Sequence, residues 1–484
     1  LYNQSKYYSP SLQYYVPNAY QGLVGRLTYE YASRYLAEFN MGYNGTENFA
    51  KGKRFGFFPA VSLGWVISEE KFFPKNNIVK YLKVRGSYGE VGNDQIGGDR
   101  FLYLPSSYGA ASDSGVNKYN FGLASNPYTS LMIVENKIGN PDLTWEKAKK
   151  MNVGVDINLF NNCLTASFDI FKEKRNNILA NRSTSPMIIG ANLPAYNFGE
   201  MENRGWEMDL NFRHHIQDFH YWARFNYSFA RNEIIYMDEV QKRYDYQMTT
   251  GRRKNQFFGL IFDGYYNSWE EINALDRPKS SWSGNQLQPG DVKYIDVNQD
   301  GVIDDYDMVP IGYTPVPEII YGFSFGAQYK GFDFSILFQG ADNVSIKYFG
   351  RSMWPFAKGE ESAKSLIKER WTQERYEAGE KITFPRLSLN PNGETDHNYR
   401  PSTLWIRDAS YLRLKNLEVG YTFTGGFVKR LNLNSVRLYF NGSNLFTWTD
   451  VVDLDPEAPS RSGNVEINTY PLQKVYNIGL NINF

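Results

Sequence analysis

The sequence predicts an all-β protein whose strands form the wall of a transmembrane antiparallel β-barrel, and three observations support this. Large apolar residues alternate with small or polar ones in many segments of about ten residues, as in strands with lipid on one side and water on the other. The connections between these segments alternate between short and long. The chain also holds 37 Tyr, 33 Phe and 10 Trp, although its mean hydropathy of -0.52 is that of a polar protein.

The composition excludes several other classes. A single cysteine, Cys163, and four histidines provide neither a disulfide framework nor a Cys/His zinc site, so any metal must be bound by oxygen. The 52 basic and 52 acidic residues balance, which argues against a nucleic-acid partner. No apolar run reaches the length of a membrane-spanning helix, so a membrane role requires strands.

Thirteen strands are predicted from the period-2 pattern. They cover residues 22–31, 34–44, 57–67, 80–90, 150–160, 163–173, 204–213, 220–231, 318–329, 332–343, 410–423, 434–446 and 472–484. Ala32-Ser33, Asn161-Asn162 and Lys330-Gly331 are expected to form tight hairpin turns. Aromatic residues near many strand ends suit the girdles at the two membrane surfaces, whereas a soluble sandwich core is the ordinary alternative.

The connections suggest an orientation. Short connections follow every odd-numbered predicted strand, and the longest connections follow strands eight and ten, so residues 232–317 and 344–409 are expected to be long extracellular loops. The first and thirteenth strands both run toward the side of the short turns. A closed barrel that starts and ends on that side has an even number of strands. Thirteen is odd, so an odd number of further strands is expected to precede this sequence.

The last strand has a regular pattern. Tyr476, Ile478, Leu480, Ile482 and Phe484 alternate with Asn and Gly. A terminal aromatic after such an alternation resembles the signal that the barrel-assembly machinery reads on an exposed strand edge. The ordinary alternative is a last strand that carries a girdle residue.

Residues 296–307 follow the pattern of a twelve-residue calcium loop. The expected ligands are Asp296, Asn298, Asp300, the carbonyl of Val302, Asp304 and Asp307, with Gly301 at the sharp turn. The last ligand is Asp where Glu is usual, which shortens its reach. The alternative is a metal-free turn rich in Asx residues.

The long loops contain candidate ligand-binding rings. Tyr103, Tyr108, Trp282, Trp354 and Trp405 could stack on sugars or on peptide side chains, or the loops could pack these rings against one another. Residues 357–378 have the spacing of one short amphipathic helix. Its expected role is loop packing, or contact with a partner.

Several blocks resemble SusC-like TonB-dependent outer-membrane transporters. They are residues 22–73, LKVRGSYGEVGND at 82–94, GDVKYIDVNQDGVIDDYDMVPIG at 290–312, ASYLRLKNLEVGYTF at 409–423 and the ending from 441 to 484. The resemblance implies that residues 1–484 are the C-terminal part of a 22-stranded barrel in the outer membrane of a Gram-negative bacterium. It also implies an N-terminal plug and TonB-contacting segment outside this sequence, and a SusD-like surface lipoprotein that covers the mouth.

The resulting prediction is a non-enzymatic importer of an oligosaccharide or a peptide, driven through TonB, with structural Ca²⁺ in the loop at 296–307 and no organic cofactor. The alternative is a soluble, calcium-stabilised surface protein that binds glycans. A glycosidase would need two converging carboxylates, which a single sequence cannot show.

Overall fold

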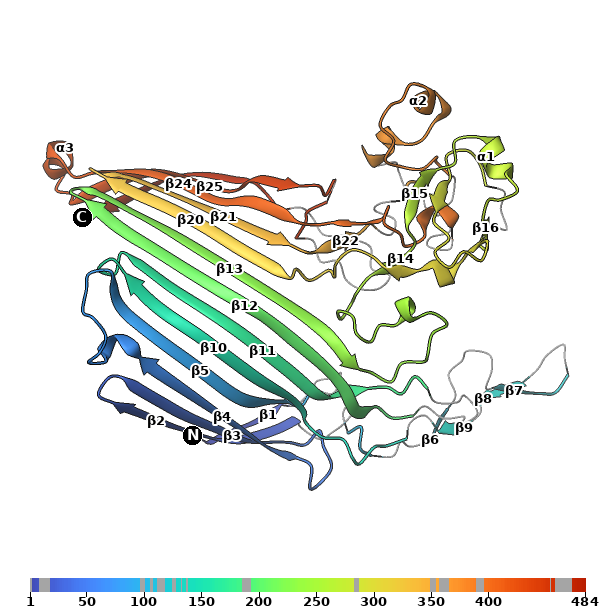
Figure 1. The fold of residues 1–484 in the computed structure, drawn as a ribbon, viewed down its shortest axis with the longest axis horizontal. Helices are drawn as coiled ribbons and strands as arrows, with labels where there is room; N and C mark the ends of the chain where they lie inside the picture. The colour runs from blue at the N-terminus through green and yellow to red at the C-terminus, as the bar shows by residue number, and fades with distance from the viewer. Residues whose placement is uncertain are drawn as a thin grey trace.

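Figure 1 shows the computed structural model of the chain, in which long antiparallel strands form one large sheet. The structure describes all residues except 1, 8–17, 96–100, 105–107, 111–117, 124–127, 132, 136–137, 185–192, 283–286, 349–353, 357–364, 389–395, 453 and 458–471. Among the described residues, no helix combines the length and the apolar character needed to cross a membrane.

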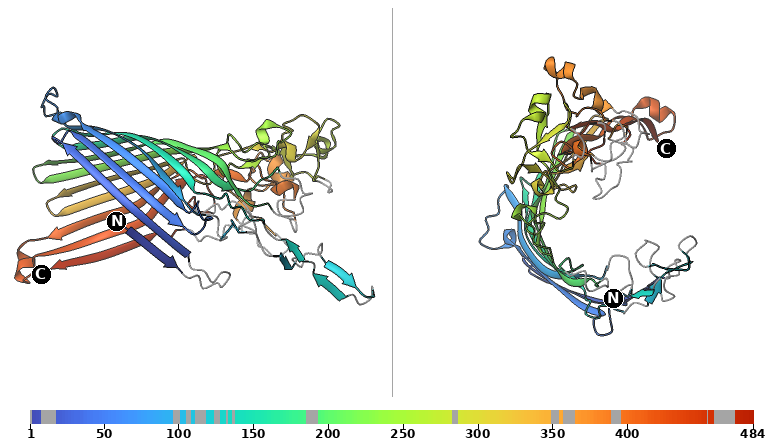
Figure 2. Two further views of the ribbon diagram at one scale, coloured as in Figure 1. Left: turned by 90° about the horizontal axis from the view of Figure 1, so that it is seen from below. Right: turned by 90° about the vertical axis from the view of Figure 1, so that its right-hand side faces the viewer.

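In the described part of the chain, the large sheet has fourteen strands, and each strand pairs with its neighbours in chain order. They are β1 (Tyr2–Tyr7), β2 (Asn18–Tyr31), β3 (Tyr35–Thr46), β4 (Phe55–Val66), β5 (Val79–Asn93), β10 (Glu146–Leu159), β11 (Leu164–Ala180), β12 (Tyr196–Ile216), β13 (Phe219–Tyr236), β20 (Ile319–Tyr329), β21 (Phe332–Asp342), β24 (Tyr411–Phe423), β25 (Ser435–Thr449) and β26 (Val475–Asn483). The sheet curves into an arc, with β1 at one edge and β26 at the other (Figure 2).

All thirteen predicted strands are confirmed, but the sheet contains one more. Tyr2–Tyr7 forms β1 and pairs along its whole length with β2. Its sequence, YNQSKY, has polar residues at both alternating sets of positions, so the period-2 pattern that revealed the others is absent. The count of thirteen was therefore wrong, and the expectation of an odd number of preceding strands loses its premise.

The short turns have the backbone geometry that their residues suggest. Lys330 and Gly331 have φ of 44° and 90°, and they join β20 to β21 as a two-residue turn. Ala32 and Ser33 are also in the left-handed region, before Arg34 leads into β3. The turn around Asn161 is longer than predicted, because it spans residues 160–163.

The long connections gather at the opposite end of the sheet from these turns (Figure 1). The described residues within 237–318 and 343–410 form a body that we call the loop cap. It contains β14 (Phe258–Gly259), β15 (Phe262–Tyr265), β16 (Lys279–Ser280), β17 (Val292–Tyr294), β18 (Val302–Ile303), β19 (Val309–Pro310), β22 (Ser345–Lys347), β23 (Ile406–Asp408), α1 (Trp269–Asn273) and α2 (Gln373–Glu377). The connection between β5 and β10 holds β6 (Tyr108–Ala110), β7 (Lys118–Phe121), β8 (Tyr128–Leu131) and β9 (Ile133–Glu135), and α3 (Gly426–Arg430) lies in the turn between β24 and β25.

The helix predicted over 357–378 is not continuous in its described part. Residues 365–369 form a 3-10 turn, and α2 begins only at Gln373, capped by the hydroxyl of Thr372. Trp371 lies between the two and is buried in the cap, so packing of this ring interrupts the helix. The rest of the predicted helix lies outside the described residues.

Candidate functional site

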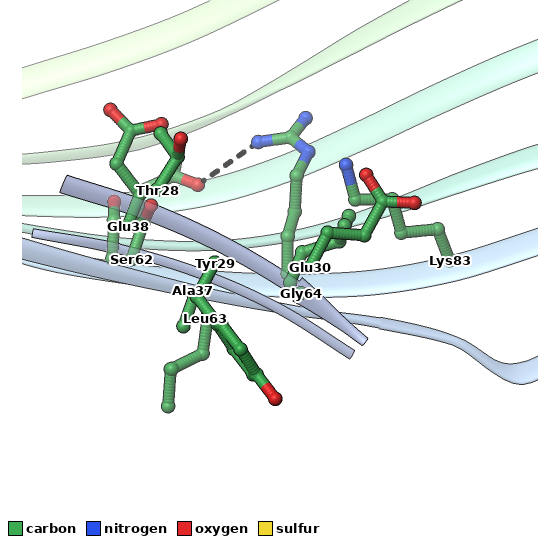
Figure 3. A pocket seen from close by; sticks show the side chains of 14 residues that line it. Thr28, Tyr29, Glu30, Ala37, Glu38, Ser62, Leu63, Gly64 and Lys83 are labelled. Carbon is green, nitrogen blue, oxygen red and sulfur yellow. Dashed lines mark hydrogen bonds between the residues drawn. The ribbon is translucent and has the colours of Figure 1, made fainter. Parts of the chain in front are cut away.

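The sheet has one apolar and one polar face, and both are visible at its N-terminal end (Figure 3). Tyr29, Ala37 and Leu63 lie side by side across β2, β3 and β4 and point to one side. Thr28, Glu38 and Ser62 occupy the neighbouring register positions and point to the other side. In a barrel wall the apolar face contacts lipid and the polar face lines the interior.

The apolar face is exposed over the whole sheet. Leu27, Leu63, Val153 and Ile170 have exposed fractions of 69%, 63%, 58% and 57%. A water-soluble monomer rarely exposes such a continuous apolar surface. The large exposed area therefore marks the side of the sheet that contacts lipid.

The polar face neutralises much of its own charge. The Arg85 guanidinium donates to both carboxylate oxygens of Asp169, at 2.7 and 2.6 Å, and its Nε lies 3.1 Å from Asp156. Farther along the sheet, Arg437 pairs with Asp333 and Glu418. These ion pairs link three adjacent strands each, so they also brace the wall.

A buried arginine ties the wall to the connection between β25 and β26. The Arg413 side chain is 2% exposed and lies 2.8 Å from Asp455 and 2.5 Å from Glu457. The Tyr411 hydroxyl donates to Glu457, and Thr447 accepts a hydrogen bond from the Arg413 Nε. Burial alone would raise the pKa of Asp455, but the hydrogen bonds from Arg413 and from two backbone N–H groups outweigh it and hold that pKa below its usual value.

The loop cap has its own hydrophobic core, built from segments far apart in the chain. Its most buried members include Leu260, Val292, Tyr348, Phe384 and Trp405. Trp405 packs edge-on against Phe384 and lies 5.3 Å from the ring of Tyr399. The two longest connections are therefore one packed body.

Four of the five predicted ligand-binding rings can be placed by their side chains. Trp354 and Trp405 are only 6% and 2% exposed and belong to the cap core, which agrees with the packing alternative for these two rings. Trp282 is half-buried beneath the guanidinium of Arg400, 4.0 Å from the ring centre. Tyr103 is partly exposed and contacts Phe101 edge-on, whereas the side chain of Tyr108 lies outside the described residues. Of the four described rings, Trp282, Trp354 and Trp405 lie in or against the cap core, whereas Tyr103 lies on the connection between β5 and β10.

A buried polar seam that the sequence did not reveal joins the two halves of the cap. Asp291 is 3% exposed and accepts a hydrogen bond from the Asn398 amide at 2.8 Å, while Arg386 lies 2.5 Å from the same carboxylate. The neighbouring His397 contacts the Val292 carbonyl at 2.7 Å, and burial lowers its pKa. These partners are about 100 residues apart, so no local motif predicts them.

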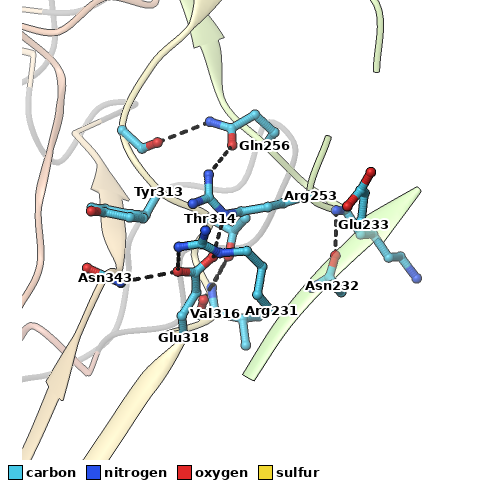
Figure 4. Close-up of polar contacts among 12 residues, drawn as sticks. Arg231, Asn232, Glu233, Arg253, Gln256, Tyr313, Thr314, Val316, Glu318 and Asn343 are labelled. Carbon is cyan, nitrogen blue, oxygen red and sulfur yellow. Dashed lines mark hydrogen bonds and ion pairs between the residues drawn. The ribbon is translucent and has the colours of Figure 1, made fainter. Parts of the chain in front are cut away.

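A second missed group is a carboxylate that fastens the cap to the wall (Figure 4). Arg231, near the end of β13, and Arg253, in the cap, converge on Glu318, whose side chain is 4% exposed. Asn343 donates to the same carboxylate at 3.2 Å. Burial would raise the pKa of Glu318, but hydrogen bonds from the two arginines outweigh it and lower that pKa.

The predicted calcium loop folds around its own backbone N–H groups. Asp296 accepts from Gln299 and Gly301 at 2.7 and 2.8 Å, and Asp307 accepts from Val297 at 2.8 Å. Asn298 and Asp300 accept from Asp300 and Val302 two residues on, and Asp304 caps the 3-10 turn that follows. Within the described residues, no three His, Cys, Asp or Glu side chains are gathered closely enough to hold a metal ion.

One member of this loop lies in an unusual environment. Asp307 is fully buried, and burial together with the charge of Asp296 raises its pKa, although three backbone N–H groups act in the opposite direction. The predicted metal ligands of the loop are all oxygen atoms, which is the ligand type that Ca²⁺ prefers. The donor set thus fits the ion, but the carboxylates are not gathered around a common point.

The last strand has the geometry that the sequence predicts. Tyr476, Ile478, Leu480 and Ile482 are exposed by 62%, 80%, 57% and 41% on β26, and Phe484 follows the strand with 86% exposed. In the described part of the chain, β26 pairs on one side only, with β25.

The fold and its two faces define the wall of an outer-membrane β-barrel. Residues 2–445 match the family model described as "TonB dependent receptor-like, beta-barrel". The chain belongs to this family, whose members are located in the outer membrane of Gram-negative bacteria.

Two curated relatives are each 28% identical to the chain. TonB-dependent receptor P3 of Formosa agariphila aligns over 95% of the chain and 45% of its own length, and TonB-dependent receptor SusC of Bacteroides thetaiotaomicron over 97% and 44%. Among solved structures, the RagAB peptide transporter is 23% identical, with a TM-score of 0.73 over 97% of this chain and 48% of that one. The chain thus spans about half the length of the relatives it matches, and the structural likeness confirms the fold.

Proposed function

We propose that the protein imports a nutrient across the outer membrane, with energy supplied from the inner membrane through TonB. The observation that carries this proposal is the two-faced wall of fourteen strands, matched to the TonB-dependent receptor barrel over residues 2–445. The long connections would lie outside the cell, as is usual for such barrels. The chain itself would perform no chemistry on its cargo.

We propose an oligosaccharide as the cargo, with a peptide as the alternative. Arg85 and Arg437 are neutralised by carboxylates, and the polar face also presents hydroxyl and amide groups, including Thr28, Ser62 and Asn152. Such a wall suits an uncharged polar molecule. A peptide remains the alternative because one relative of known structure, RagAB, is named as a peptide transporter.

Uptake by living cells tests both parts of this proposal. A strain without the gene, and the same strain complemented with the full-length protein, would be given labelled oligosaccharides and labelled peptides. We expect oligosaccharide uptake only in the complemented strain, and its loss when a protonophore dissipates the proton gradient. Uptake that survives the protonophore would contradict energised import, and peptide uptake alone would reverse our choice of cargo.

We further propose that a SusD-like lipoprotein covers the loop cap and that the barrel-assembly machinery recognises β26. The packed cap core supports a surface that a lid could contact, and β26 carries the exposed apolar alternation that ends at Phe484. A tagged full-length protein should co-purify with one lipoprotein in equal amounts. Deletion of Ile482–Phe484 should abolish insertion into the outer membrane, and unchanged surface levels would refute the assembly signal.

We also propose that residues 296–307 bind Ca²⁺ as a structural ion. Asp296, Asn298, Asp300, the Val302 carbonyl, Asp304 and Asp307 would hold it, and the ion would relieve the charge of the buried Asp307. Calorimetric titration of Ca²⁺ into the full-length protein should give binding heat that Asp307→Asn removes. Asp305→Asn, at a 75% exposed carboxylate of the same turn, should leave the heat unchanged. No heat at millimolar Ca²⁺, the weak end of protein sites, would exclude the ion.

A further inference from the structure

The apolar, lipid-facing side of the wall, which we call the outer face, changes from apolar to cationic toward the loop-cap ends of β11, β12 and β13. Ile170, Trp206 and Phe229 lie opposite one another in a single row across these strands. The next row on the same face consists of Lys172, Arg204 and Arg231. The step between the two rows is two residues, about 6.6 Å along a strand.

This step marks the level of the lipid headgroups. Trp206 stacks on the ring of Tyr227 at 4.7 Å, a pair of the kind that lies at the membrane surface. On β10 the apolar outward positions extend from Met151 to Leu159, nine residues, which matches the length of a membrane-spanning strand. The cationic row therefore lies just above the hydrocarbon, on the side of the long connections.

Three cations in one cross-strand row repel one another, because like charges directly opposite are destabilising. Lys172 is neutralised by Glu202 at 2.9 Å and Arg231 by Glu318 at 2.8 Å. Arg204 is 63% exposed, and its nearest carboxylate, Glu233, is 4.0 Å away. Arg204 is thus the weakly compensated member of the row.

The cap adds two more arginines at the same place. Gly251 and Arg252 exchange backbone hydrogen bonds with Ile234 at 2.8 Å, so this segment runs alongside the end of β13. Arg252 and Arg253 then line a cavity of about 420 Å³ together with Arg204 and Arg231. Arg253 is neutralised by Glu318, but the structure shows no carboxylate partner for Arg252 among the described residues.

We propose that this arginine pocket binds the phosphate group of an anionic lipid in the outer leaflet. Four arginines face the carboxylates of Glu233 and Glu318, which leaves an excess of positive charge in the pocket. One guanidinium group can donate two parallel hydrogen bonds to two oxygens of a phosphate, so arginine is a preferred side chain for binding phosphate. A bound phosphate would also screen the repulsion between Arg204 and Arg231.

Lipid retention by the full-length protein tests this assignment. The protein would be placed in nanodiscs of phosphatidylcholine mixed with phosphatidic acid, and the lipids that remain after detergent extraction would be identified by native mass spectrometry. We expect preferential retention of phosphatidic acid by the unmodified protein. Arg204→Gln/Arg252→Gln should reduce the preference about tenfold or more, the factor that corresponds to one lost charge-assisted hydrogen bond.

Lys147→Gln/Lys149→Gln provides a matched control, because these outward lysines on β10 both lie near Glu90 and away from the pocket. This variant loses the same charge and should keep the preference. Equal retention by the unmodified protein and the arginine variant, or an equal loss in the lysine variant, would overturn the proposal. Heat-modifiable gel migration verifies that each variant is folded. If the double variant does not fold, lipid retention is measured with Arg252→Gln alone.

A soluble anion is distinguished by a separate measurement. Inorganic phosphate added to the protein in nanodiscs of phosphatidylcholine alone should raise the melting temperature less than phosphatidic acid does. An equal or larger rise with inorganic phosphate would show that the pocket serves a soluble ligand, and the assignment to a lipid would be wrong.

Discussion

The attachment of the loop cap to the barrel wall is predicted to depend on Glu318. Replacing it with Gln removes the charge on which Arg231 and Arg253 converge and leaves two guanidinium groups facing a neutral amide. Breaking a fully buried ion pair costs about 3–5 kcal/mol, but these arginine side chains are 40% and 23% exposed and keep contact with water. We therefore expect a local loss of about 2 kcal/mol.

Hydrogen–deuterium exchange of the full-length protein measures this loss. The N–H groups of Gly251 and Ile234 are bonded across the junction that Glu318 fastens. A loss of about 2 kcal/mol corresponds to exchange about 30-fold faster in peptides covering residues 249–256. Glu233→Gln is the control, because that carboxylate is 44% exposed and 4.0 Å from its arginine, and its effect should be within about 0.5 kcal/mol. Equal exchange in the two variants would show that Glu318 does not fasten the cap to the wall.

The same junction should respond to acid with a defined sign. The arginines hold the pKa of Glu318 below its ordinary value of 4.5, so the carboxylate stabilises the junction fully above that value. This contribution is lost as the pH falls through the lower, folded-state pKa. Protection of residues 249–256 should therefore decline in acid in the unmodified protein and much less in Glu318→Gln. A similar decline in both would show that another group titrates.

Three further substitutions test the cap core, the lipid face and one close backbone approach. Trp405→Ala should destabilise the cap by about 3–5 kcal/mol, measured as faster limited proteolysis of the cap, because the ring is 2% exposed. Val155→Arg on the lipid face should cost about 2–4 kcal/mol in the unfolding of the barrel from lipid, whereas Asn226→Arg on the polar face should cost little. Gly205→Ala should reduce the folded fraction on a heat-modifiability gel, because the added Cβ would lie 1.9 Å from a carbonyl oxygen of β13. Gly86→Ala is the control and should fold normally, because the nearest atom to its Cβ would be 3.8 Å away.

Local patterns were sufficient for most of the wall. Each of the thirteen predicted strands alternates in sequence because one face meets lipid, and this physical cause acts residue by residue. The predicted strands were too short at the cap-side ends of β10 to β13: those on β10 and β12 began too late and those on β11 and β13 ended too early. Charged residues such as Lys174 and Glu202 occupy the apolar face there. There the strands continue beyond the hydrocarbon, and the alternation that revealed them stops.

The cap was not predictable in the same way. Trp354 and Trp405 could not be distinguished from exposed rings, because their burial depends on contacts with distant segments. The carboxylates that organise the cap, Asp291 and Glu318, have partners as many as 107 and 87 residues away. Such pairings are set by the tertiary fold and have no signature in spacing.

The apolar face of this sheet lies in lipid and the polar face lines the barrel interior. A cysteine scan of Met151–Leu159 tests this arrangement, in the full-length protein with Cys163→Ser, reconstituted in lipid and spin-labelled at one position at a time. We expect a period of two: labels at odd positions should be relaxed by oxygen, which dissolves in the bilayer, and labels at even positions by a water-soluble nickel reagent. Equal access of the nickel reagent to both sets of positions would show that the odd-numbered side chains do not lie in lipid.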